Sequence, residues 1–181
     1  MSRARISWLS TVLAALSAVV VLASLRELPR RTAVEPAQGN TVAVQKPALS
    51  AEEEVYAAAL WPIHSETVEA SAVAMSFAGV DYVTQHHDPH RLAAKVVRLR
   101  ERFRMATDKA QAVPVPPSMQ KVHGQYLEAL SLYQDASAEM MKVADDGEVE
   151  HLIAAQSMSQ RAAEDLLKVG DVLWPSEHKP N

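Results

Sequence analysis

The chain has 181 residues, a formal net charge of −4, no cysteine and five glycines. The absence of cysteine excludes disulfides, thiolate nucleophiles, thiolate zinc sites and covalently attached c-type haem, and the glycines form neither GxGxxG nor a P-loop. Residues 1–31 are net +4, which leaves −8 for the rest, and so acidic a domain argues against nucleic-acid binding.

Residues 6–25 form an uncharged apolar stretch, and Arg3 and Arg5 precede it. At about 1.5 Å per residue, a helix of this length just crosses a hydrocarbon core of about 30 Å. We therefore expect an N-terminal signal anchor over residues 1–26, a single-pass membrane protein and an extracytoplasmic domain, periplasmic or extracellular. The same layout fits a signal peptide cleaved after Ala23, so both alternatives stay open.

Residues 27–49 contain three prolines and one glycine and show no sustained hydrophobic period. Such a composition is typical of an extended tether between a membrane and a domain. Residues 50–175 are long enough to bury one core, and residues 176–181 are expected to form a polar tail.

The first helix of the domain is expected to begin at Ser50 and to reach about residue 85. Ser50 and Glu53 have the spacing of a capping box, in which each side chain accepts a hydrogen bond from the other's backbone amide. Pro62 either kinks this helix or opens a second segment. Residues 70–83 are apolar almost all round, which predicts that the first helix is the most buried helix of the domain. The expected core stripe is Trp61, His64, Val68, Ala72, Met75, Gly79 and Tyr82.

Asp88 and Pro89 predict the cap and the first position of a second helix that ends near Ala112. Its expected core stripe is Leu92, Val96, Leu99, Phe103, Ala106 and Ala110. A basic stripe with the same spacing runs beside it and consists of Arg91, Lys95, Arg98 and Arg102.

The basic stripe has two interpretations. It is either a solvated face that neighbouring acidic helices neutralise, or a docking surface for an acidic partner or for anionic lipid headgroups. Asp81, in the apolar part of the first helix, is expected to pair with a cation because an unpaired buried carboxylate is costly.

Residues 113–117, VPVPP, cannot be helical through their centre and separate the second helix from a third that ends near Ala144. The third helix carries a coiled-coil-like seam with Met119, Tyr126, Tyr133 and Met140 at sevens, and with His123, Leu130, Ser137 and Ala144 as companions. Asp145 to Gly147 form a turn into a fourth helix. Its stripe is Leu152, Ala155, Ser159, Ala162, Leu166, Val169 and Leu173. The predicted fold is all-α, an antiparallel up-down four-helix bundle preceded by the signal anchor and the proline-rich tether.

In that fold the turn after the first helix and the turn after the third share one end of the bundle. The metal-ligand candidates gathered there are His86, His87, His90, Asp146 and His151. Imidazole and carboxylate groups suit zinc, nickel or copper(II), whereas a polar end of capping groups and solvated charges is the plainer interpretation.

A second candidate site lies on the core stripes, where turn counting brings His64 and His123 to similar heights. Two facing histidines can ligate haem b or one metal ion, and two hydrogen-bonded core histidines are the plainer alternative. No nucleophile and base pair stands out, so no catalytic residue is predicted.

The sequence thus favours a non-enzymatic interaction, scaffold or accessory subunit that is held at the membrane by its N-terminal helix. Its expected partner is a protein or a larger membrane complex. The alternative is an extracytoplasmic sensor or carrier that binds metal or haem through the histidines named above.

Overall fold

The computed structural model describes residues 48–175, except the side chain of His86. The expected signal anchor (residues 1–26), nearly all of the tether (27–49) and the polar tail (176–181) therefore lie outside the described residues. The described part is all-α, with four long helical runs and no strand. Within it, no helix has both the length and the apolarity that a membrane span requires.

The first helical run begins with the predicted capping box and extends from residue 51 to residue 86. Ser50 N donates to Glu53 Oε2 at 2.7 Å, and Glu53 N donates to Ser50 Oγ at 3.4 Å. The run consists of α2 (Ala51–Pro62), the π-helical η2 (Ile63–Glu69), α3 (Ala70–Asp81) and the π-helical η3 (Tyr82–His86). Pro62 lies inside the run, and the wider π-helical turns of η2 follow it directly; a proline has no amide hydrogen to donate and crowds the preceding turn.

The turn into α4 (Pro89–Gln111) has the predicted chemistry. His87 adopts a left-handed conformation with φ of 45°, which reverses the chain. Asp88 then caps α4, because its Oδ1 accepts hydrogen bonds from the amides of His90 and Arg91 at 3.0 and 3.1 Å. Pro89 occupies the first turn, where its missing amide hydrogen is not needed.

After the proline-rich connection, a 3₁₀ turn, η4 (Pro117–Met119), leads into α5 (Gln120–Asp146). Gly147, at a φ of 76°, ends α5 in the left-handed conformation that glycine adopts without strain. The last helix, α6 (Glu150–Leu173), follows at once and ends at Trp174.

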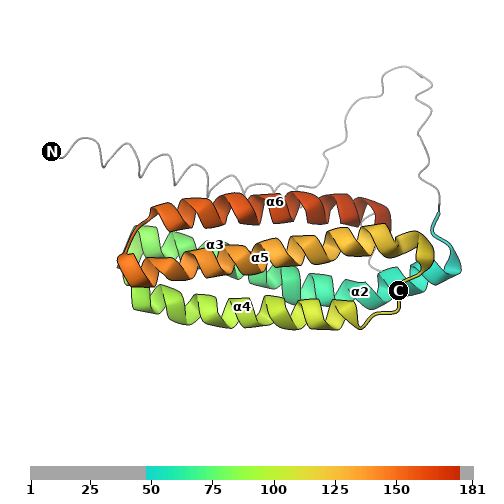
Figure 1. The fold of residues 1–181 in the computed structure, drawn as a ribbon, viewed down its shortest axis with the longest axis horizontal. Coiled ribbons are helices and arrows are strands. Elements are labelled where there is room, and N and C mark those ends of the chain that lie inside the picture. Colours follow the sequence, from blue (N-terminus) through green and yellow to red (C-terminus); the bar gives the residue numbers. More distant parts are fainter. Residues whose placement is uncertain (1–47, 176–181) are drawn as a thin grey trace, which may run out of the picture. The chain divides into compact units, whose positions relative to one another are not determined.

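The helical runs pack side by side as a bundle, with α5 between α4 and α6 in the view of Figure 1. Two hydrogen bonds show which ends meet. Lys95 Nζ, near the start of α4, donates to Asp81 Oδ2 at the end of α3 at 2.6 Å, as expected for a carboxylate in this position. Trp174 Nε1, after α6, donates to the carbonyl of Ala57 in α2 at 3.2 Å.

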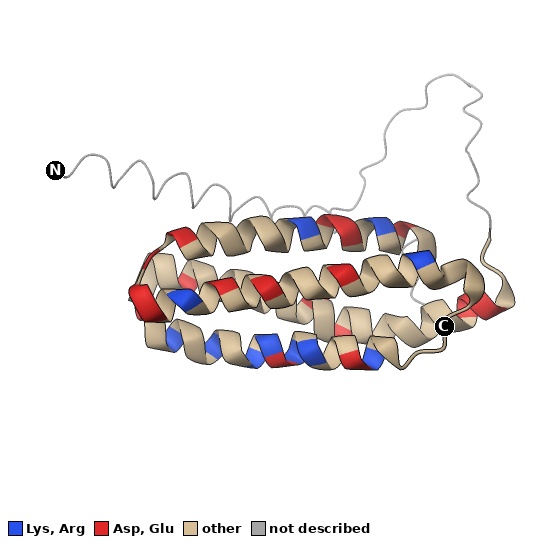
Figure 2. Ribbon diagram, viewed as in Figure 1, with Lys and Arg blue, Asp and Glu red and all other residues tan. Residues whose placement is uncertain are grey.

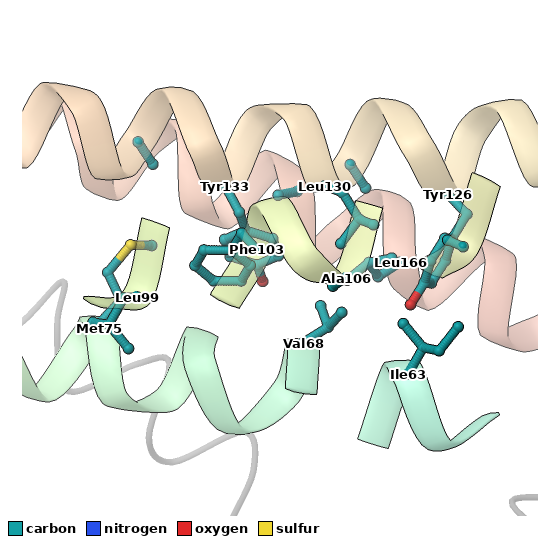
Figure 3. Close-up of a cluster of buried hydrophobic side chains, with 14 of the residues drawn as sticks. Ile63, Val68, Met75, Leu99, Phe103, Ala106, Tyr126, Leu130, Tyr133 and Leu166 are labelled. Atoms are coloured by element: carbon teal, nitrogen blue, oxygen red, sulfur yellow. The ribbon is translucent and has the colours of Figure 1, made fainter. Parts of the chain in front are cut away.

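Most of the core is formed by the apolar stripes that the sequence predicts (Figure 3). In the first helical run, however, the predicted Trp61 and Ala72 are only partly buried, and the core also includes Tyr56, Leu60 and Ile63. All six predicted core positions of α4 are buried. The four seam residues spaced seven apart, Met119, Tyr126, Tyr133 and Met140, are buried as well. In α6, six of the seven predicted positions are buried and Ser159 is partly exposed. The rings of Phe103 and Tyr133 stack at the centre, with centroids 4.9 Å apart and planes within 2° of parallel. Burial, rather than any covalent link, therefore holds the helices together.

Two phenylalanines provide a matched test of this packing, because Phe103 is fully buried and Phe77 is 57% exposed. Phe103→Ala should lower the free energy of unfolding by about 3–5 kcal/mol, since it leaves a cavity against Tyr133. Phe77→Ala should lower it by less than about 1 kcal/mol. Urea unfolding of the full chain, followed by circular dichroism, measures both. Equal losses would contradict the placement of Phe77.

Candidate functional site

One surface of the domain carries an exposed apolar row on α3. Val73 is 52% exposed, Phe77 is 57% exposed, and Ala70 is also exposed. These residues are three and four positions apart, so they lie on one side of the helix. Asp81 lies one turn beyond Phe77 and bonds to Lys95 of α4, which places the Phe77 end of the row toward α4, while Val73 lies on the outward side of α3.

This row lies within residues 70–83, whose apolarity almost all round is the basis for predicting that the first helix is the most buried helix of the domain. Ser71, Met75, Ala78 and Gly79 do face the core. The neighbouring helices, however, cover only that side of α3 and leave Val73 and Phe77 to solvent. Apolarity all round a helix indicates a need for cover and does not say that the same chain supplies that cover on every side.

The predicted basic stripe lies on α4 and is only partly neutralised (Figure 2). Lys95 Nζ lies 2.6 Å from Asp81 Oδ2, and Arg91 Nε lies 3.8 Å from the same oxygen. Arg102 Nη2 donates to the backbone carbonyl of Glu66 at 3.3 Å, which satisfies a donor without cancelling the charge. Arg98 is exposed and, among the described residues, has neither an ion pair nor a hydrogen-bond partner. The stripe therefore has one neutralised half and one half that lacks a carboxylate.

A second feature is a cluster of histidine and aromatic rings that joins the first helical run to α5. Tyr56 Oη and His123 Nδ1 share a hydrogen bond at 2.9 Å, and the two rings meet edge to face. Burial raises the pKa of Tyr56 to about 12 and lowers the pKa of His123, because in each case the charged form loses hydration. The pair is therefore held as a neutral phenol and a neutral imidazole.

His64 occupies the same cluster in η2, where the ring of Trp174 stacks on it with centroids 4.9 Å apart. Its Nε2 lies 3.5 Å from Glu69 Oε1, whereas its Nδ1 is buried without a hydrogen-bond partner among the described residues. The hydroxyl of Tyr126 is likewise buried and unpartnered, and it points toward Ile63 in Figure 3.

His64 and His123 do not pair with each other in this cluster. His123 bonds to Tyr56, and His64 packs against Trp174 and against Tyr126, whose ring centroid is 6.0 Å away. No described contact tests a haem or a metal ion between the two histidines, so that interpretation stays a prediction. The role of Trp174 could not be predicted from the sequence, because it depends on the packing of the end of α6 against the first helical run.

The histidines predicted as metal ligands at the other end of the bundle are dispersed. His87 and His90 are exposed, and the side chain of His86 lies outside the described residues. His151 instead bridges α5 and α6, with Nδ1 at 2.6 Å from Glu139 Oε1 and Nε2 at 2.9 Å from Asp146 Oδ2. Over residues 48–175, three or more His, Asp or Glu side chains nowhere form a group that could hold a metal ion.

Both nitrogens of His151 face carboxylates, and both can donate only when the ring is protonated. These two hydrogen bonds raise the pKa of His151. Hydrogen bonds from Lys142 and His151 lower the pKa of Glu139. The pKa of Asp146 is lowered as well, chiefly by the hydrogen bond from the backbone amide of Glu148. Glu139 lies twelve residues before His151 across the turn, so counting across a helical hairpin would have found it. The metal interpretation remains untested by this geometry.

Comparison of the chain with protein-family models, with curated proteins and with solved structures finds no match. The functional argument therefore depends on the surfaces and side chains of the described residues.

The two histidines with shifted pKa values should give stability opposite dependences on pH. The raised pKa of His151 contributes stability that is fully present below the unfolded value of about 6.5 and is lost as the pH rises through the folded-state value. The lowered pKa of His123 contributes stability that is present above about 6.5 and is lost as the pH falls through its folded-state value.

Urea unfolding of the full chain between about pH 4.5 and pH 8.5 measures both effects. His151→Gln should flatten the alkaline side of the profile, and His123→Gln should flatten the acid side. A profile that neither substitution changes would contradict both assignments.

Proposed function

We propose that the protein is a signal-anchored, antiparallel up-down four-helix bundle that acts outside the cytoplasm as a non-enzymatic interaction or accessory subunit. We further propose that it contacts its partner through the α3–α4 surface, defined as Ala70, Val73 and Phe77 on α3 with Arg98 and Arg102 on α4. The exposed apolar row is the observation that carries the proposal.

The free energy gained by covering apolar side chains supports a role for this row in association. Complete burial of an exposed valine or phenylalanine side chain contributes about 1.5–3 kcal/mol, and since Val73 is 52% and Phe77 57% exposed, covering each contributes about half of that. Phenylalanine and arginine are also enriched in the centres of protein interfaces. Two apolar side chains beside two guanidinium groups therefore form the centre of a modest interface, whereas a solvated face needs neither Val73 nor Phe77.

The polar residues of the domain support a binding role over catalysis. The imidazoles of His64 and His123 sit among buried or partly buried rings, and the carboxylates around His151 engage both of its nitrogens. A base in either position is already occupied or enclosed, and neither lies beside a nucleophilic side chain on the surface.

Protein rather than lipid is the favoured partner of the α3–α4 surface. A basic residue near an anionic membrane contributes about 1 kcal/mol, so Arg98 and Arg102 together would hold the surface only weakly. A protein partner can place carboxylates opposite Arg98 and Arg102 and apolar groups opposite Val73 and Phe77.

Photo-crosslinking in native membranes tests this contact. Benzoylphenylalanine in place of Phe77 should give one adduct heavier than the monomer, whereas the same group at the exposed Ser131 of α5 should give none. Replacing both Arg98 and Arg102 by glutamate should reduce the adduct. The proposal fails if position 77 gives no adduct or if both positions give the same adducts. It also fails if the group crosslinks only within its own chain, so that the product keeps the mass of the monomer.

Fusions to the C-terminus of the full chain test the location. An alkaline phosphatase fusion should be active and a fluorescent protein fusion dark, because phosphatase requires export. Fluorescence without phosphatase activity would reverse the proposed orientation. The mass of the mature protein separates an uncleaved anchor from a signal peptide cut after Ala23.

A further inference from the structure

The α3–α4 surface has a chemical order that specifies more than a generic contact. Its centre is the apolar row of Val73 and Phe77, and its α4 border is the half of the basic stripe that lacks a carboxylate. The contrast with the outer face of α4 is informative. There Arg104 is paired twice, with Glu101 at 2.7 Å and with Asp108 at 2.6 Å.

We propose that this surface binds an amphipathic helix whose apolar side is flanked by carboxylates. This inference rests on the proposed function and names the partner's chemistry. Residues spaced three and four apart on α3 form a ridge, and a ridge packs best between the side chains of another helix. Arg98 and Arg102 present planar forks of donors that match carboxylates with two hydrogen bonds each.

Charge complementarity decides between this partner and a second copy of the chain. In a two-fold pair with α3 antiparallel to its copy, the α4 stripe of one protomer faces the α4 stripe of the other. Like charges then meet at Arg98 and Arg102, whereas an acidic helix supplies the missing carboxylates. The other end of the same flank needs no partner charge, since Lys95 already has Asp81 at 2.6 Å.

Three synthetic helices of about 18 residues test the proposal against the full chain in detergent micelles. The first has leucines every third or fourth position and glutamates beside them. The second replaces each glutamate by lysine, and the third scrambles the first. Fluorescence anisotropy should show the glutamate helix binding at least about tenfold more tightly than either of the others.

Substitutions with matched controls locate the binding. Phe77→Ser should abolish binding of the glutamate helix, while Leu167→Ser, at a leucine of α6 that is 55% exposed, should leave it unchanged. Replacing Arg98 and Arg102 by glutamate should reverse the preference toward the lysine helix. Arg100→Glu, two positions from Arg98 and thus on another face of α4, should not.

The inference is overturned by equal binding of the glutamate and lysine helices, or by a preference that Phe77→Ser leaves intact. It is also overturned if the full chain forms dimers that Phe77→Ser dissociates, or if only vesicles of anionic lipid bind in an Arg98-dependent way. An adduct from benzoylphenylalanine at position 77 without any preference for the glutamate helix would refute the partner's chemistry alone. Failure of both experiments would refute the proposed function as well.

Discussion

A helix with one apolar stripe is satisfied by one core, whereas a helix that is apolar on most of its circumference needs cover on every side. In α4 and α6 the buried residues fall on a single stripe, with polar and charged residues over much of the remaining surface. In α3, Met75 and Gly79 face the core while Val73 and Phe77 face solvent. Because residues 48–175 give α3 no further neighbour on that side, the first helical run is the element on which both the core and the proposed contact depend.

The polar groups inside the bundle are concentrated where the first helical run is least regular. Pro62 and η2 interrupt the α-helical hydrogen-bond pattern there. The Nδ1 of His64 and the Oη of Tyr126, which have no hydrogen-bond partner within the described part of the chain, belong to the same region. A buried unpaired polar group costs about 1–3 kcal/mol, so neighbouring contacts must offset it. Trp174 supplies them, because its ring stacks on His64 and its Nε1 bonds to the carbonyl of Ala57. Trp174, directly after α6, thus stabilises the irregular part of the first helical run.

Periodicity and capping chemistry predicted most of the fold. The capping box at Ser50, the Asp88–Pro89 turn and the core stripe of α4 all occur as expected, since each depends on residues close in sequence. The sequence predicted that Asp81 pairs with a cation but not which one, because Lys95 is identified only by the packing of α3 on α4. The cluster of Tyr56, His123 and Trp174 could not be predicted, because it depends on which helices cross near their ends. Apolar composition likewise could not say which side of α3 stays open.

The chain contains no cysteine, so a single substitution provides a unique label for the open face of α3. The central claim is that Phe77 is accessible in the isolated protein and covered by a partner in the native membrane. The rate at which a water-soluble maleimide modifies Phe77→Cys should therefore be high for purified protein and at least about tenfold lower in native membranes, while Ser131→Cys reacts equally in both. Equal rates for Phe77→Cys in the two settings would contradict the account.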